Sequence, residues 1–168
     1  MIRRLALLFA IAATVAGCQL HPLYAGGSSG PVAEMLRHVS VAPIPGRAGW
    51  LVFNKLKEQI GAAGDAHVPT YRLDVELDDE IVGLAIRGDR AATRERRILR
   101  ARYQLVQLSN GQVLLDATAG SDAGIDVVSS EYATVAAEQT AEERLAEIVA
   151  SDIVERLGLY AVRTGARP

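Results

Sequence analysis

The sequence predicts an α+β fold: a two-layer sandwich in the order β-α-β-β-β-α, with two helices packed on a four-stranded, mostly antiparallel sheet. Three observations predict it. Apolar and polar residues alternate strictly over residues 71–78, an Asn110-Gly111 pair separates two further alternating segments, and apolar residues recur at helical spacing in residues 49–62 and 132–159. With 168 residues, 49% of them hydrophobic and 23% charged, the chain is long enough for one domain with its own core.

The first strand and the first helix follow from short patterns. Residues 38–42 alternate polar and apolar and end at Pro43, which predicts a short strand at the edge of the sheet. Residues 49–62 are expected to form an amphipathic helix that glycines bring to an end. The apolar stripe of that helix consists of Trp50, Phe53, Leu56 and Ile60.

Three further strands are predicted after this helix. In residues 71–78 the odd-numbered apolar side chains are expected to be buried and the even-numbered polar ones exposed. The alternation slips at residues 79–81, which predicts a bulge there. A third strand is expected over residues 98–108, and Asn110-Gly111 predicts a hairpin into a fourth strand over residues 112–119.

The last predicted element is a long surface helix over residues 132–159. Its buried side is expected to be an apolar stripe, and acidic and basic residues occupy the opposite side. Thr140-Ala-Glu-Glu143 is similar to a capping box, which predicts a break near Thr140. The stripe consists of Leu145, Ile148, Val149, Ile153 and Leu157.

The N-terminus is typical of a bacterial lipoprotein signal. Two arginines precede a short apolar stretch that ends at Cys18, the single cysteine of the chain. Residues 1–17 are therefore expected to be removed, Cys18 to carry the acyl chains, residues 18–31 to form a Gly/Ser-rich tether and residues 32–168 to form the domain. Gln19 in place of Asp favours the outer membrane. The alternative is an ordinary secretory signal with a coincidental cysteine.

Several classes of function have no support in the sequence. It contains no nucleophile elbow, phosphate-binding loop or dinucleotide fingerprint, so we expect neither an enzyme nor a bound cofactor. Its three histidines lack the spacing of metal ligands, so no metal site is expected. The acidic segment 74–80 lacks the glycine turn of a calcium loop. A formal charge of −2 argues against a nucleic-acid-binding surface.

One segment is strongly basic, although the chain as a whole carries a small negative charge. Seven arginines lie between Arg87 and Arg102 against two acidic residues, a local charge of +5, whereas the processed chain carries 16 basic and 20 acidic residues and the rest of it is therefore at −9. Guanidinium groups suit bidentate binding of phosphate or carboxylate. An extended segment would place four of the arginines, 94, 96, 100 and 102, on one face. The candidates for binding an anionic ligand are Arg94, Arg96, Arg97, Arg100 and Arg102.

A second interpretation of the same arginines stays open. They would form a solvated strand face, paired across the sheet with the charged side chains of residues 72–78. The two interpretations are compatible, because an acidic neighbouring strand would also hold the arginines in place for a ligand.

Four segments together resemble the LptE family of lipopolysaccharide-assembly lipoproteins, in its alphaproteobacterial form. They are Ala16-Gly-Cys-Gln-Leu-His-Pro-Leu-Tyr24, Gly49-Trp-Leu-Val-Phe-Asn-Lys-Leu56, Thr93-Arg-Glu-Arg-Arg-Ile-Leu-Arg-Ala-Arg-Tyr-Gln-Leu105 and Glu131-Tyr-Ala-Thr-Val-Ala-Ala-Glu138.

The resemblance implies a non-catalytic lipoprotein on the periplasmic side of the outer membrane. It would plug, and help to assemble, the lipopolysaccharide-translocating β-barrel LptD, and would bind lipopolysaccharide or a related anionic glycolipid. The alternative is an accessory lipoprotein of an ABC-type lipid-transport system. A small periplasmic hydrolase is a weaker alternative, since no nucleophile–base pair is found.

Overall fold

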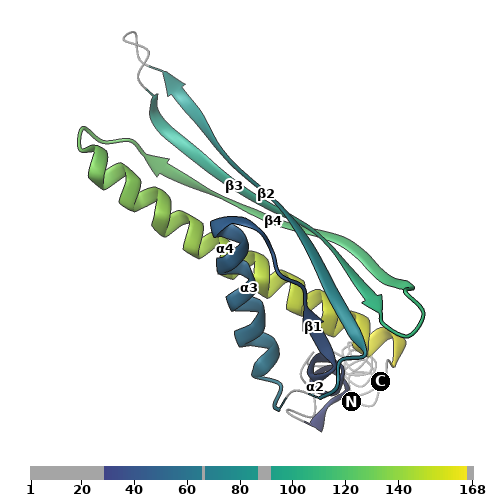
Figure 1. Cartoon of the computed structure of the whole chain (residues 1–168). Helices are drawn as coiled ribbons and strands as arrows, with labels where there is room; N and C mark the ends of the chain where they lie inside the picture. Colours follow the sequence, from purple (N-terminus) through teal and green to yellow (C-terminus); the bar gives the residue numbers. More distant parts are fainter. Residues whose placement is uncertain (1–28, 66, 87–91, 166–168) are drawn as a thin grey trace, which may run out of the picture.

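The computed structural model describes residues 29–65, 67–86 and 92–165 and has the predicted α+β architecture (Figure 1). The four strands lie in the order β1-β2-β3-β4, with β1 parallel to β2 and the other neighbours antiparallel. In chain order the elements are α2 (Pro31–Arg37), β1 (Val39–Val41), α3 (Gly46–Gly61), β2 (Tyr71–Ile86), β3 (Ala92–Gln107), β4 (Val113–Asp126) and α4 (Glu131–Thr164).

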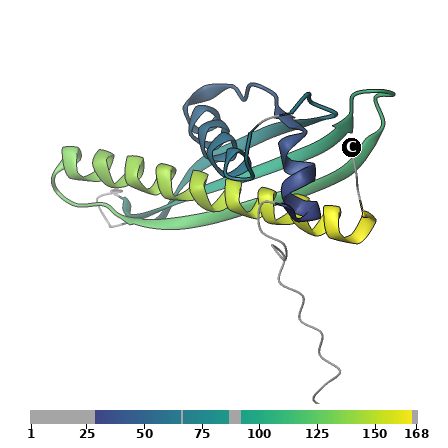
Figure 2. The ribbon, with the colours of Figure 1, turned by 90° about the horizontal axis from the view of Figure 1, so that it is seen from below.

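The domain is long and narrow, because its main elements run side by side along one direction (Figures 1 and 2). Helix α4 has 34 residues, which corresponds to about 51 Å, and it lies along β3 and β4. Helix α3 packs on α4 and on the β1–β2 edge. Helix α2 packs on α4 and α3. Helices α3 and α4 thus cover one face of the sheet, and the other face is left open.

The buried face of the sheet is the one that the alternation predicts. Tyr71 and Leu73 on β2, and Leu99 and Tyr103 on β3, are almost fully buried. Each such side chain stabilises the fold by about 1.5–3 kcal/mol relative to an exposed one. Their partners on α4 are members of the predicted stripe, namely Leu145, Val149, Ile153 and Leu157.

The first long helix begins earlier than predicted, and its apolar stripe is the predicted one only in part. Leu56 and Ile60 are buried as predicted, but Trp50, which was expected in the core, is 64% exposed, and Val52 is fully buried in its stead. The reason is a close approach at Gly49, where an added Cβ would lie 2.7 Å from the carbonyl oxygen of Ile44. Since only glycine fits there, the side of α3 that carries Gly49 packs against Ile44, and Trp50 points to the solvent.

Three other expectations need correction. Helix α2 was not predicted at all. The bulge expected at residues 79–81 is absent: β2 and β3 pair without a shift from Tyr71 to Gly83, and the irregularities lie between Gly83 and Ile86. Helix α4 does not break near Thr140, whose hydroxyl donates to the Ala136 carbonyl inside a continuous helix. The helix is instead capped by Ser130.

The predicted lipoprotein segment precedes the described domain. The signal peptide, Cys18 and most of the tether lie outside the described residues. Among the helices of the described part, none combines the length and the apolar character that a membrane-spanning segment needs.

Candidate anion-binding face

The even-numbered side chains of β2, β3 and β4 form the uncovered side of the sheet, here called the open face. Arg94, Arg96, Arg100 and Arg102 all lie on it and are exposed, so four of the five arginines singled out in the sequence share one surface. The alternation of β3 explains this, because the four positions differ by even numbers.

Most of these arginines are paired with carboxylates of β4. Arg94 Nε lies 2.9 Å from Asp126 Oδ1, Arg96 Nε lies 3.5 Å from Asp122 Oδ2, and Arg102 Nη2 lies 2.9 Å from Asp116 Oδ2. The sequence-based interpretation assigned these partners to β2 instead. The hydrogen bond from Arg102, followed by that from Gln104, lowers the pKa of Asp116, which therefore stays ionised.

The open face is acidic in sum despite its row of arginines. It carries five arginines and seven carboxylates among the described residues, which gives a net charge of −2. The seven are Asp74, Glu76, Asp78, Glu80, Asp116, Asp122 and Asp126. A surface of alternating sign with a small net charge is suited to polar contact with another mixed surface rather than to general attraction of anions.

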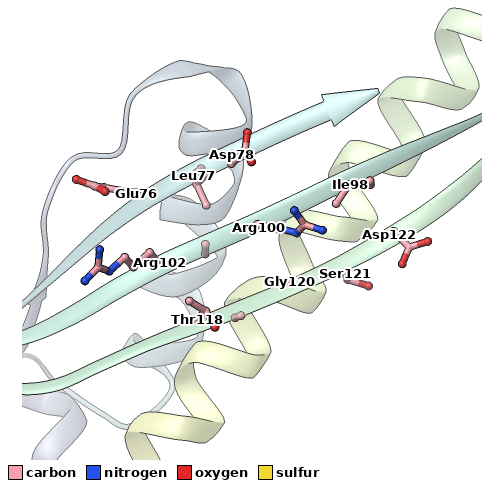
Figure 3. A pocket seen from close by; sticks show the side chains of 12 residues that line it. Glu76, Leu77, Asp78, Ile98, Arg100, Arg102, Thr118, Gly120, Ser121 and Asp122 are labelled. Atoms are coloured by element: carbon pink, nitrogen blue, oxygen red, sulfur yellow. The ribbon is translucent and has the colours of Figure 1, made fainter. Parts of the chain in front are cut away.

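Arg100 differs from its three neighbours. Within residues 29–65, 67–86 and 92–165, no salt bridge joins Arg100 to a carboxylate. Its Cγ lies beside Gly120, its neighbour on β4, where an added Cβ would be 3.3 Å from that atom. Around it the open face is hollowed into a shallow depression of about 600 Å³, which Asp78, Thr118 and Asp122 also line (Figure 3).

The fifth arginine of the sequence prediction lies elsewhere. Arg97 occupies an odd position of β3, so its side chain points to the helix side and is only 11% exposed. There it binds Asp79 at 2.9 and 2.5 Å, Glu142 Oε1 of α4 at 3.2 Å, and the carbonyl of Glu138 at 3.2 Å. Arg97 is therefore unsuited to contact an external anion together with the other four.

The sequence did not reveal a partly buried ion cluster, which is centred on the buried carboxylate of Glu142 and includes Arg97, Asp79 and the exposed Arg47. Glu142 is 5% exposed and also contacts Arg47 Nε at 3.2 Å through Oε2. The hydrogen bond to Asp79 raises the pKa of Arg97, although partial burial opposes the shift. Two positive and two negative groups compensate one another, so the cluster joins β2, β3, α3 and α4 without a net buried charge.

One protein-family model matches most of the described domain. The model of the LptE family, described as lipopolysaccharide-assembly, matches residues 36–157. No curated protein matches the sequence.

Several solved structures share the fold. A protein described as a lipoprotein from Caulobacter crescentus CB15 is 20% identical with a TM-score of 0.65, over 81% of this chain and 98% of that one. A minor lipoprotein from Acinetobacter baumannii is 15% identical with a TM-score of 0.58, over 72% and 91%. The rare lipoprotein B of Shewanella oneidensis is 11% identical with a TM-score of 0.54, over 76% and 97%.

Proposed function

Since the chain belongs to the LptE family of lipopolysaccharide-assembly proteins, we propose that it works as a non-catalytic plug and assembly factor of the β-barrel LptD. The long domain would stand inside the barrel and occupy its lumen. Lipopolysaccharide, or a related anionic glycolipid, would pass beside it to the outer leaflet of the outer membrane.

The feature that supports a contact with the barrel lumen is the uncovered, charged open face of the sheet. This face spans three strands, lacks a covering helix and presents charged groups of both signs. The interior of a large membrane barrel is polar, so a plug needs a hydrated surface able to pair with charges on the barrel wall. An exposed sheet face of this composition meets that need, whereas an apolar face would require an apolar partner surface or a membrane.

The membrane attachment is proposed to come from acyl chains on Cys18, at the periplasmic side. Several buried acyl chains hold a protein at a membrane essentially permanently, at about 0.8 kcal/mol for each buried CH₂. A tethered domain meets its barrel at a raised effective concentration. Mass spectrometry of the mature protein tests the attachment: a diacylated Cys18 supports it, and an unmodified thiol contradicts it.

Photo-cross-linking in living cells tests the lumen contact. A photoreactive amino acid replaces Glu76 or Thr118, which are exposed on β2 and β4 of the open face. Irradiation is expected to join both variants to LptD, and samples kept in the dark give the background. Folded variants that cross-link to an inner-membrane permease instead, or to no barrel at all, would contradict the proposal.

The ion pairs narrow the proposed glycolipid contact to Arg100. Its guanidinium is exposed, lies in a depression and has no carboxylate partner among the described residues, so it binds a phosphate without first breaking an ion pair. Arg100→Ser is expected to weaken lipopolysaccharide binding several-fold, measured with the purified complex and labelled lipopolysaccharide. Arg102→Ser is expected to have a smaller effect, because Asp116 already engages that side chain.

Arg72→Ser is the matched control for the change in charge. Arg72 is exposed on the same face and is held by Asp74 at 2.8 Å. Its loss is expected to leave binding of the glycolipid within experimental error. Equal effects of the changes at residues 72 and 100, or no effect of either together with normal barrel co-purification, would remove Arg100 from the glycolipid path.

A further inference from the structure

Three side chains from separate segments meet beside the first residues of the domain. Glu34 lies on α2, His38 directly precedes β1, and His67 belongs to the loop before β2. One ligand atom from each of the three lies within 4.8 Å of the other two. His38 Nε2 is 3.6 Å from Glu34 Oε1, and the two imidazole rings stand edge to face with centroids 5.0 Å apart.

Each imidazole is oriented by a backbone carbonyl. His38 Nδ1 is 2.9 Å from the carbonyl oxygen of Val68, and His67 Nδ1 is 3.0 Å from that of Asp65. A carbonyl oxygen accepts only, so both Nδ1 atoms carry the proton, and in the neutral rings both Nε2 atoms keep a free lone pair. Histidines that bind metals show this arrangement, with one nitrogen on the ion and the other donating to a carbonyl.

The carboxylate of Glu34 divides its two oxygens between different partners. Oε2 binds the guanidinium of Arg37, which also donates to the carbonyl of Ala63, while Oε1 is directed towards His38. One oxygen of Glu34, Oε1, is therefore directed towards the imidazole rings and available for a cation.

We propose that Glu34, His38 and His67 bind a divalent transition-metal ion, with Zn²⁺ as the ion that this donor set favours. Two imidazole nitrogens and one carboxylate oxygen are a known zinc set, and they leave the fourth position to water. Neighbouring ligands of a tetrahedral zinc ion are about 3.3 Å apart, so the 3.6 Å between His38 Nε2 and Glu34 Oε1 requires little movement. The bound ion would join α2, the first helix after the predicted tether, to the loop before β2.

The test uses the full chain, purified in detergent with an affinity tag free of histidine. Isothermal titration with ZnCl₂ is expected to give one ion per chain, and Co²⁺ is expected to give the visible absorption of a tetrahedral site. His38→Gln and His67→Gln are each expected to weaken zinc binding at least about ten-fold. Zinc should raise the melting temperature of the wild-type chain but not of these two variants.

His21→Gln is the matched control, since His21 is the third histidine of the chain and is not one of the three proposed ligands. It is expected to bind zinc like the wild type. The exposed loop position of His67 makes its substitution compatible with folding, which circular dichroism of the metal-free variant checks. Weak, unsaturable binding that is equal in all four proteins, or loss of binding in His21→Gln alone, would overturn the proposal.

Discussion

Replacement of Arg97 by alanine is expected to destabilise the domain by about 3–5 kcal/mol, the cost of breaking a buried ion pair by removing one partner. The change leaves Glu142, which is 5% exposed, with the exposed Arg47 alone, and it leaves Asp79 without its guanidinium. Urea unfolding of the purified chain, followed by circular dichroism, measures the difference.

Arg96→Ala is the control, because it removes the same side chain from the adjacent position on the open face. Arg96 is half-exposed and meets Asp122 at 3.5 Å, so the expected loss is about 0–1 kcal/mol. In addition, Glu142→Ala is expected to cost less in the Arg97→Ala background than in the wild type, since the two residues share one network. Equal losses for the Arg96 and Arg97 variants would show that the cluster does not hold α4 to the sheet.

Replacement of Leu157 by alanine is expected to cost about 2–5 kcal/mol, because Leu157 is fully buried where α4 meets the sheet and its truncation leaves a cavity. Leu159 lies two positions further along the same helix and is 41% exposed. Leu159→Ala, with the same chemistry, is expected to stay within about 0.5 kcal/mol of the wild type. Thermal and urea unfolding of both variants check the orientation of α4, and a reversed order of the two losses would contradict it.

The alternation of apolar residues predicted the sheet wherever a helix covers it. Tyr71 to Val75 and Leu99 to Leu105 are buried at odd positions, as predicted, because the pleat and the helical layer impose a period of two, and Leu77 is partly buried. Beyond Leu77 the strands continue where the pattern fails. Backbone pairing and the ion pair between Arg97 and Asp79 join β2 to β3 there, and neither requires an alternation in burial.

The missed helix α2 had a local signal that is short but physical. Pro31 occupies its first turn, Glu34 lies near its start and Arg37 in its last turn, which is the favourable order of charges. Seven residues after a glycine-rich segment are too few for a periodic pattern to stand out. The break expected at Thr140 failed for the opposite reason, since a capping motif inside a long helix is satisfied by the helix itself.

The candidate site was predicted in part, because the sequence shows which residues are charged but not which of them form ion pairs. The family resemblance is confirmed by the match over residues 36–157, and the even spacing placed four arginines on one face. The pairing of those arginines with carboxylates of β4 depends on the order of the strands. Arg97 points towards α4 because it occupies an odd-numbered position of β3, and its partner Glu142 lies on that helix. His38 and His67 come together through long-range contacts without a local signal, namely the parallel pairing of β1 with β2 and the hydrogen bond from His67 N–H to the Arg37 carbonyl.

Affinity purification from detergent-solubilised envelopes, with identification of the partner, tests the proposed role most directly. A tag on the chain is expected to retain a large outer-membrane β-barrel of the LptD type together with lipopolysaccharide or a related anionic glycolipid. Recovery of an ABC permease of the inner membrane, or of the chain alone under conditions that preserve membrane complexes, would contradict the account.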